Sequence, residues 1–291
     1  MVNLVTKISQ VVARSAWTDK MAKLKEYRTR TCRYPDSMLG RTNFLPTSVH
    51  PGGVLVVAAH PDDDILGVGT TLIRHAAAGE HITVAFTTNG AGGDPKKSMD
   101  AQRTIVQMRY EETCSALDLI HIPSSQVINL GFPDGGAHRY VLPLVADVRQ
   151  LLETVDPSRI YVHSMEGGHP DHDITSFVVQ QVCHEAGFSA LFEWAEYNRE
   201  CPLSTSQIHF PHDPYLGASN FTRIEMTAEE AQLKKAMLDL HRSQRDVIPA
   251  VPSRNGEVIR EANPTNLTAR LQYFIKLPRR RALNVMQQLQ Y

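Results

Sequence analysis

The segment Val54-Leu55-Val56-Val57-Ala58-Ala59 is followed directly by His60-Pro61-Asp62-Asp63. An unbroken apolar run of this length, rich in β-branched residues, is typical of a strand buried on both faces of a parallel sheet. Open α/β sheets place their chemistry at the carboxyl ends of such strands. The imidazole and the two carboxylates therefore lie where a functional site is expected.

Segments of strand and helix character alternate from residue 51 onward. Strands are expected at 54–59, 82–87, 127–130, 160–162 and 191–197, and helices at 65–78, 104–119, 142–155, 175–186 and 228–244. This alternation predicts an α/β fold with a Rossmann-like, doubly wound, mainly parallel sheet and an irregular C-terminal lid region. Residues 201–220 are expected to be irregular. Residues 246–266 are expected to form a lid or surface loop, followed by a short strand or helix.

The first fifty residues differ from the rest of the chain in their basic character. Apolar residues recur there at helical spacing, which predicts a helix docked on the body by one face. An organellar transit peptide or a partner-binding arm is the alternative, because the first eighteen residues carry no acid. Residues 51–291 are expected to form a single catalytic domain, to which 201–291 contribute lid and substrate loops.

The composition indicates a soluble globular protein. Of 291 residues 42% are hydrophobic, and the net charge of −1 gives no electrostatic reason to expect a nucleic acid or an anionic membrane as partner. No apolar run approaches the roughly 18 residues that cross a bilayer. The four cysteines form no Cys-x-x-Cys pair, so neither a disulfide framework nor a thiolate metal site is indicated. A cytoplasmic location is expected.

A second polar motif, His169-Pro170-Asp171-His172, follows the short strand expected at 160–162. His60 and Asp63 stand three residues apart across a strand-to-helix turn, so both side chains can converge on one point. With His172 they make a set of two imidazoles and one carboxylate. Such a set suits Zn²⁺, and three protein ligands leave a position for water, as in catalytic sites. Fe²⁺ would also accept these ligands.

The carboxylates beside His60 have a simpler interpretation as helix caps. Asp62, Asp63 and Asp64 precede an expected helix, and acids stabilise helix N-termini. Capping, however, requires one acid and does not account for the imidazole. Asp62 is placed to act as a base toward a metal-bound water, whose pKa falls to about 7 on zinc. Gly67-Val68-Gly69 is not a dinucleotide fingerprint, because it lies inside the expected helix and lacks a third glycine.

Both motifs resemble those of the LmbE-like or PIG-L-type zinc deacetylases, which act on N-acetylglucosaminyl compounds. The family's Ala-His-Pro-Asp-Asp-Glu stands here at 59–64, with Asp64 in place of the glutamate, and its second motif stands at 169–172. Residues 87–93, Arg109 with Glu112, residues 130–135 and His241-x-Ser243-Gln244 are also similar to family elements. The similarity extends from residue 54 to about residue 245.

The resemblance implies roles for eight side chains. His60, Asp63 and His172 would bind zinc, and Asp62 would be the general base. His169 would polarise or protonate at the reacting carbonyl, Asp171 would orient His169, and Arg109 and Asp134 would contact the sugar. Gly167-Gly168 stands where some family members have a tyrosine near the oxyanion. A donor to the oxyanion would therefore have to come from elsewhere or be absent. Trp194 is the first choice among the aromatic residues for stacking on a pyranose face, although core or rim positions are commoner for such residues.

The function implied is zinc-dependent hydrolysis of the N-acetyl group of an N-acetylglucosaminyl small molecule. A soluble glycoside, such as an antibiotic or thiol-sugar precursor, would yield acetate and a free amino sugar. The alternatives are a metal-dependent phosphoester hydrolase, which usually needs ligands for two metals, and a non-catalytic metal-binding protein. The run Arg279-Arg280-Arg281 is expected to be a solvated tail or to contact an anionic group on the substrate or a partner subunit.

Overall fold

A computed structural model of the chain describes residues 33–36, 38–42, 51–92, 98–203, 205, 207–217, 220–246 and 256–289. The helix expected near the N-terminus lies outside these residues. Within them, no helix is both long enough and apolar enough to span a membrane.

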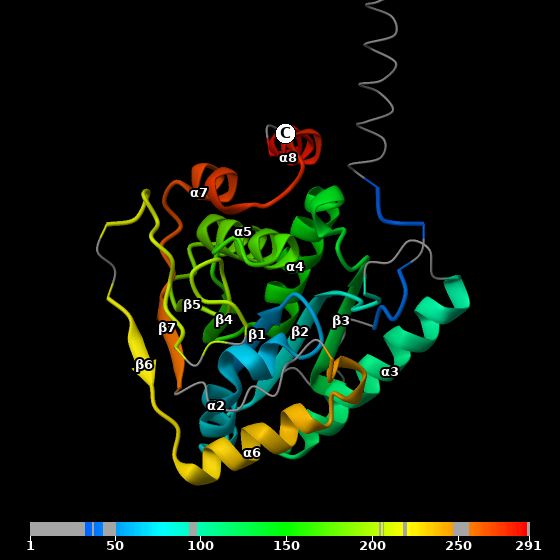
Figure 1. The fold of residues 1–291 in the computed structure, drawn as a ribbon, viewed down its shortest axis with the longest axis vertical. Helices are drawn as coiled ribbons and strands as arrows, with labels where there is room; N and C mark the ends of the chain where they lie inside the picture. Colours follow the sequence, from blue (N-terminus) through cyan, green and yellow to red (C-terminus); the bar gives the residue numbers. More distant parts are fainter. Residues whose placement is uncertain are drawn as a thin grey trace, which may run out of the picture.

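Seven strands form one sheet in the order β3-β2-β1-β4-β5-β7-β6 (Figure 1). The first five strands in this order run parallel, whereas β7 pairs antiparallel with both β5 and β6. The strands are β1 (Val54–Ala58), β2 (Ile82–Thr88), β3 (Val127–Phe132), β4 (Arg159–His163), β5 (Leu191–Trp194), β6 (Thr222–Ile224) and β7 (Glu257–Glu261). The predicted α/β class with a mainly parallel sheet is confirmed.

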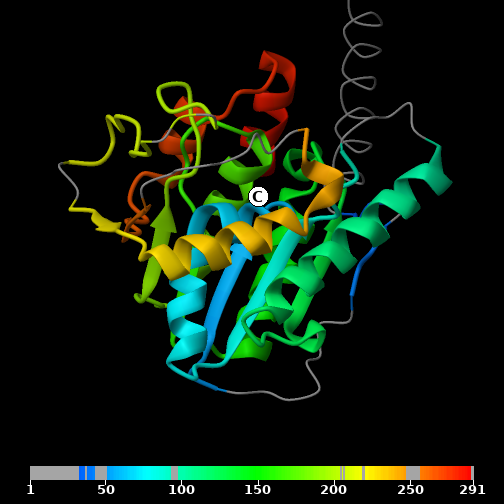
Figure 2. The ribbon, with the colours of Figure 1, turned by 60° about the horizontal axis from the view of Figure 1, so that its bottom comes forward.

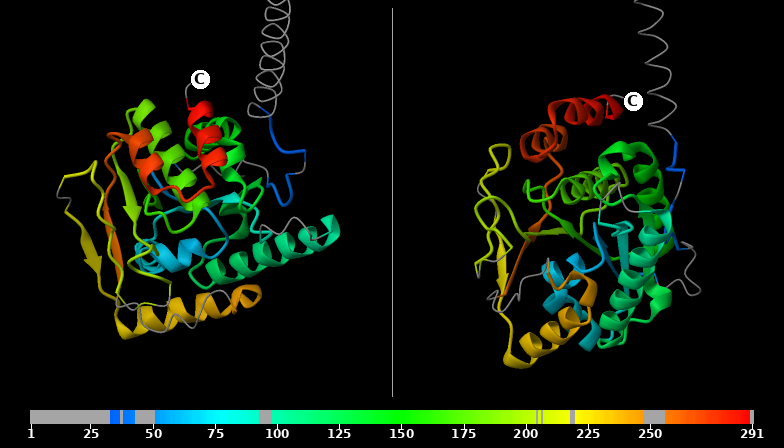
Figure 3. Two further views of the ribbon diagram at one scale, coloured as in Figure 1. Left: turned by 45° about the horizontal axis from the view of Figure 1, so that its top comes forward. Right: turned by 45° about the vertical axis from the view of Figure 1, so that its right-hand side comes forward.

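Helices cover both faces of the sheet (Figure 1). Val54, Val56 and Ala58 of β1 pack toward α2, α3 and α6, and Leu55 and Val57 pack toward α4, α5, α7 and α8. Figure 2 shows α6 lying across α2 and α3, and Figure 3 shows the opposite layer. The helices are α2 (Asp63–Ala77), α3 (Met99–Asp118), α4 (Val141–Val155), α5 (Pro170–Glu185), α6 (Ala228–Asp239), α7 (Leu267–Phe274) and α8 (Arg279–Gln288).

Two helix boundaries differ from the predicted ones in ways that affect the polar motifs. The helix expected from residue 175 begins at Pro170, because Pro is favoured in the first turn of a helix and His169 caps its free N–H groups. His172 therefore lies in the first turn of α5. The helix expected over 228–244 ends at Asp239, and a short 3₁₀ turn (Arg242–Gln244) follows it.

Residues 246–266 contain a strand, contrary to the expected loop. β7 lies between β5 and β6, and three of its five residues are charged. Two of these charges are buried in ion pairs: Glu257 with Lys234, and Arg260 with Glu193. Charged side chains can occupy a buried strand when they are paired. The apolar pattern used to predict strands therefore did not reveal β7.

Glu257 fastens β7 to two helices. The backbone of α2 is not helical at Val68, and this kink leaves N–H groups of the following turn without helical partners. The Glu257 carboxylate accepts hydrogen bonds from the N–H groups of Thr70 and Thr71 and from the Thr71 hydroxyl. Lys234 of α6 donates to the same carboxylate at 2.7 Å. One buried carboxylate therefore joins α2, α6 and β7.

We expect Glu257→Ala to lower the free energy of unfolding by about 3–5 kcal/mol, because it leaves the Lys234 charge buried without a partner. Denaturant titration of the full chain measures this loss. Lys235→Ala is the matched control, since its ion pair with Asp239 on the same helix is exposed and should contribute little. Equal effects of the two substitutions would contradict the assigned role of Glu257.

Candidate functional site

Polar side chains gather at the carboxyl edge of the sheet, where β1 and β4 lie side by side. His60 and Asp63 follow β1, His163 ends β4, and His169 and His172 begin α5 directly after β4. From β1 the strand order leads to β2 and β3 on one side and to β4 and β5 on the other. The cluster therefore lies at the topological switch point, where open α/β sheets bind ligands.

Three side-chain atoms form a compact triangle. His60 Nδ1 lies 3.0 Å from Asp63 Oδ2, His172 Nε2 lies 3.2 Å from the same oxygen, and the two ring nitrogens are 3.3 Å apart. Ligands about 2.0–2.1 Å from a tetrahedral zinc ion would be separated by about 3.3 Å. The triangle fits one such ion and leaves its fourth position open. All three residues are nearly buried.

Other side chains in the cluster could also contribute to a metal site. Ligand atoms of His60, His169 and His172 lie close enough to share an ion, as do those of Asp63, His163 and His172. His163 Nε2, however, accepts a hydrogen bond from the Ala59 N–H at 3.0 Å, which occupies the lone pair that a metal would need. This hydrogen bond makes His163 a poorer ligand than His60 and His172.

The second ring nitrogen of His60 faces two carboxylates. Nε2 lies 3.3 Å from Asp134 Oδ1 and 3.5 Å from Asp171 Oδ2. Histidines that bind metals commonly place a carboxylate at the nitrogen that does not bind, and this partner fixes the ring orientation. Asp134 also accepts a hydrogen bond from the Gly92 N–H at 2.8 Å. Asp134 thus connects the loop after β2 to His60.

Asp62 has a strained backbone and does not cap α2. Its φ of 132° lies in a region that L-residues rarely adopt, and its side chain accepts no hydrogen bond from the helix N-terminus. Asp62 Oδ2 instead accepts a hydrogen bond from Arg109 Nη2 at 3.1 Å. Arg109 also donates to the carbonyl oxygens of Pro61 and Gly90. Burial raises the pKa of Asp62 well above its usual range, although Arg109 opposes this shift.

His169 is held as a neutral hydrogen-bond donor. Its Nδ1 accepts a hydrogen bond from the Asp171 N–H at 3.2 Å, so the neutral ring carries its proton on Nε2. Burial, together with the charges of His60 and His172, lowers the pKa of His169 to about 4. The Asp171 carboxylate itself accepts hydrogen bonds from the N–H groups of Gly135 and Ala137. Asp171 therefore contacts His169 through its backbone.

A cavity of about 310 Å³ opens over this cluster. Six of the eight predicted side chains line it, and Asp171 and His172 lie behind them. Leu203 and Gln244 from the C-terminal third of the chain complete its walls. The volume lies at the lower end of the range for small-molecule sites.

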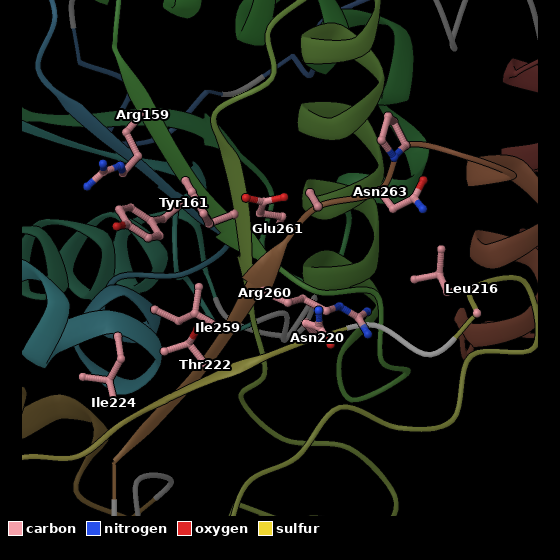
Figure 4. A pocket seen from close by; sticks show the side chains of 14 residues that line it. Arg159, Tyr161, Leu216, Asn220, Thr222, Ile224, Ile259, Arg260, Glu261 and Asn263 are labelled. Carbon is pink, nitrogen blue, oxygen red and sulfur yellow. The ribbon is translucent and has the colours of Figure 1, made fainter.

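A larger cavity, of about 980 Å³, lies elsewhere on the sheet (Figure 4). Its walls come from β4, β5, β6 and β7 and from the segments that precede β6 and follow β7. Figure 4 shows Arg159 and Tyr161 near Ile259 and Ile224. None of the candidate site residues lines it, so its size does not mark the chemistry.

His163 and Glu196 belong to the cluster, although neither lies in one of the two polar motifs. The His163 ring stacks on His172 with centroids 4.0 Å apart, and its Nε2 lies 3.4 Å from Asp63 Oδ2. Its Nδ1 lies 3.3 Å from Glu196 Oε2, which follows β5. Both residues stand at carboxyl ends of parallel strands. The rule that drew attention to His60 could have found them as well.

The aromatic expectations are corrected in part. Trp194 is fully buried, donates a hydrogen bond to Glu196 and packs so tightly on Gly67 that a side chain there would collide with it, so it is no platform for a sugar. Tyr197 lines the cavity, with its ring 5.3 Å from that of His172. A side chain at Gly168 would collide with the Tyr197 carbonyl. The second glycine thus makes room for Tyr197.

The segment that carries this site is similar to known proteins. Residues 55–183 match the PIG-L family, described as GlcNAc-PI de-N-acetylase. A probable N-acetyl-alpha-D-glucosaminyl L-malate deacetylase of Bacillus cereus is 35% identical over 124 residues, which cover 41% of this chain and 56% of that protein. The uncharacterised deacetylase YaiS of Escherichia coli (strain K12) is 31% identical over 126 residues, which cover 41% of this chain and 62% of that protein. The matched segments span about three fifths of these relatives.

Solved structures share the fold. A deacetylase of teicoplanin biosynthesis superposes with a TM-score of 0.55 at 20% identity, covering 71% of this chain and 96% of that one. The N,N'-diacetylchitobiose deacetylase of Pyrococcus horikoshii superposes with a TM-score of 0.54 at 18% identity. The match covers 73% of this chain and 84% of that one. Both motifs lie within residues 55–183, the segment that is similar to the PIG-L family.

Proposed function

We propose that this protein is a zinc-dependent N-deacetylase that hydrolyses the acetamide of an N-acetylglucosaminyl small molecule. The triangle of His60 Nδ1, Asp63 Oδ2 and His172 Nε2 carries the proposal, because it offers three ligands for one ion beside two further polar groups. Those groups are Asp62 and His169. The names of the relatives, which describe deacetylases of glucosaminyl compounds, support the same reaction.

The metal and the residues would divide the chemistry between them. A bound divalent ion supplies a Lewis acid and an acidified water at neutral pH. Asp62 accepts a proton from the attacking water, and its raised pKa makes it a competent base. His169 donates a hydrogen bond from Nε2 to the acetyl oxygen as negative charge develops there.

Collapse of the tetrahedral intermediate completes the reaction. The bond between the acetyl carbon and the amide nitrogen breaks, and protonated Asp62 gives its proton to the departing amine. The products are acetate and a free amino sugar. We assign the proton transfers to Asp62 because the pKa of His169, about 4, keeps its ring neutral at pH 7. The Tyr197 hydroxyl is the candidate for a second donor to the acetyl oxygen.

The experiment that tests this proposal is a panel of N-acetylglucosaminyl compounds incubated with zinc-loaded protein and assayed for new primary amine. We expect soluble glycosides to be deacetylated faster than simple N-alkyl acetamides, because contacts to the sugar, away from the reacting amide, help to orient that amide. Equal kcat/KM for sugars and simple acetamides would remove the amino-sugar part of the proposal. No amine from any compound would contradict the activity itself.

We expect one divalent ion per chain, and loss of both the ion and the activity on chelation. His60→Ala, Asp63→Ala and His172→Ala should each weaken metal binding strongly, since each removes one of three protein ligands. His184→Ala, at an exposed position of α5, is the matched control. Metal analysis measures the stoichiometry. Two ions per chain would instead favour a phosphoester hydrolase.

Asp62→Asn should retain the metal and lower kcat at least about a hundredfold, because an amide cannot accept the proton of the attacking water. His169→Ala should also retain the metal and lower kcat about 10²- to 10³-fold, through loss of the donor to the oxyanion. Metal content and steady-state kinetics are measured on the same samples. Release of the ion by either substitution would show that its role is wrongly assigned.

Arg109 and Asp134 line the cavity and are candidates for sugar contacts, but Arg109 also binds Asp62. We propose that positioning Asp62 is the main role of Arg109. Arg109→Ala should therefore lower kcat more than it raises KM, whereas loss of a contact made only to the sugar would raise KM alone. Arg103→Ala, at an exposed position of the same helix, should change neither. A pure KM effect would contradict the positioning role.

A further inference from the structure

A second polar cavity, of about 750 Å³, lies beside the C-terminal helix α8. Four arginines line it: Arg33, Arg139, Arg280 and Arg281. Two of them belong to the arginine run that begins α8, and Arg139 lies on the segment between β3 and α4. The same segment contributes Asp134 and Gly135 to the wall of the candidate catalytic cavity. The two cavities thus share one loop, residues 133–140.

The position of α8 on this loop is fixed by a buried glutamine. Gln288 Oε1 accepts a hydrogen bond from the Val141 N–H at 3.0 Å, and Gln288 Nε2 donates to the His138 carbonyl oxygen at 3.0 Å. Gln288 is 1% exposed. Two hydrogen bonds of one buried side chain hold α8 against the short turn at His138 and against the start of α4 (Figure 3). Arg280 and Arg281 therefore lie on a helix that is fixed to this loop.

His138 gives the cavity an unsatisfied polar group. The residue is 2% exposed, it lines the cavity, and neither of its ring nitrogens has a hydrogen-bond partner in the described part of the chain. A buried polar group without a partner costs about 1–3 kcal/mol, so a ligand that bonded to it would recover that loss. Burial is the main cause that lowers the pKa of His138 to about 4. The charges of Arg139 and Arg281 also lower this pKa, whereas the charge of Asp171 raises it. At pH 7 the neutral ring offers one N–H donor.

The charge of the cavity is unbalanced. Among the described residues, no ion pair involves Arg139, Arg280 or Arg281, and the one carboxylate in the wall, Asp36, lies 3.6 Å from Arg33. Guanidinium groups bind phosphate oxygens in pairs of parallel hydrogen bonds. A bound anion reduces the repulsion between neighbouring guanidinium groups, and several arginines around one cavity suit a dianion better than a single carboxylate.

We propose that this cavity is a binding site for a phosphate group, held by Arg139, Arg280 and Arg281 with a hydrogen bond from the His138 ring. The site is separate from the metal triangle and does not depend on the proposed deacetylation. The phosphate group is either free phosphate or a phosphate ester on the aglycone of a substrate that reaches across the shared loop.

Isothermal titration of the full chain with inorganic phosphate tests the site without any assay of activity. We expect a dissociation constant of about 1 mM or tighter for one phosphate per chain. The double variant Arg139→Ala/Arg281→Ala should bind at least about tenfold more weakly, because it removes two charged hydrogen-bond donors. Arg139→Lys/Arg281→Lys should recover part of the affinity, and Arg103→Ala is the matched control. No phosphate binding by the wild type, or equal affinity in the double alanine variant, would overturn the proposal.

The ring signals of His138 provide a second readout that surface charge alone would not move. Phosphate should shift these signals in an NMR titration and raise the pKa of His138, since an adjacent anion favours the imidazolium form. If none of the His138 signals shifts at saturating phosphate, the proposal is also overturned.

Competition kinetics distinguish the two sources of the phosphate group once the binding is established. A phosphate ester on the substrate predicts that inorganic phosphate competes with phosphate-bearing N-acetylglucosaminyl compounds and that Arg139→Ala/Arg281→Ala raises KM for those compounds alone. Free phosphate as ligand predicts binding without competition. Both results require the site, and an absence of deacetylation would leave the titration result unaffected.

Discussion

A single buried oxygen, Asp63 Oδ2, is the centre on which the candidate site depends. It accepts a hydrogen bond from the His60 N–H at 2.7 Å and lies within 3.4 Å of ring nitrogens of His60, His163 and His172. Burial alone would raise the pKa of Asp63, but His172 and His60 hold it well below its usual range. A carboxylate that stays ionised among imidazoles is suited to a cation, and the parallel pairing of β1 with β4 brings these groups together.

The same turn directs two neighbouring carboxylates to different partners. Asp62 and Asp63 are neighbours in sequence, yet the strained φ of Asp62 directs its carboxylate to Arg109 while Asp63 faces the imidazoles. Strain of this kind costs about 1–3 kcal/mol and persists only where surrounding contacts impose it. Three hydrogen-bonding contacts of Arg109, to Pro61, Gly90 and Asp62, supply that constraint. Two adjacent carboxylates can thereby take different roles.

Sequence reasoning located the polar motifs at the sheet edge because local apolar runs define parallel strands and their ends. It missed β7, whose buried charges are satisfied by Lys234 and Glu193 from distant segments, since such pairing leaves no local pattern. His163 ends a parallel strand, but its partners, Asp63 and Glu196, follow other strands, so the local sequence does not show their contacts. The α/β class could be predicted from order along the chain, whereas the contacts that surround the proposed metal ligands depend on strand neighbours that only the fold establishes.

Zinc K-edge absorption spectroscopy on the zinc-loaded protein tests the central claim most directly, because it reports the number and type of atoms around the ion. The geometry predicts two imidazole nitrogens and one carboxylate oxygen at about 2.0–2.2 Å, with a water as fourth ligand. His172→Ala should reduce the imidazole count to one, and His163→Ala should leave the count at two. Three imidazoles in the wild type, or loss of one in His163→Ala, would contradict the ligand set of His60, Asp63 and His172.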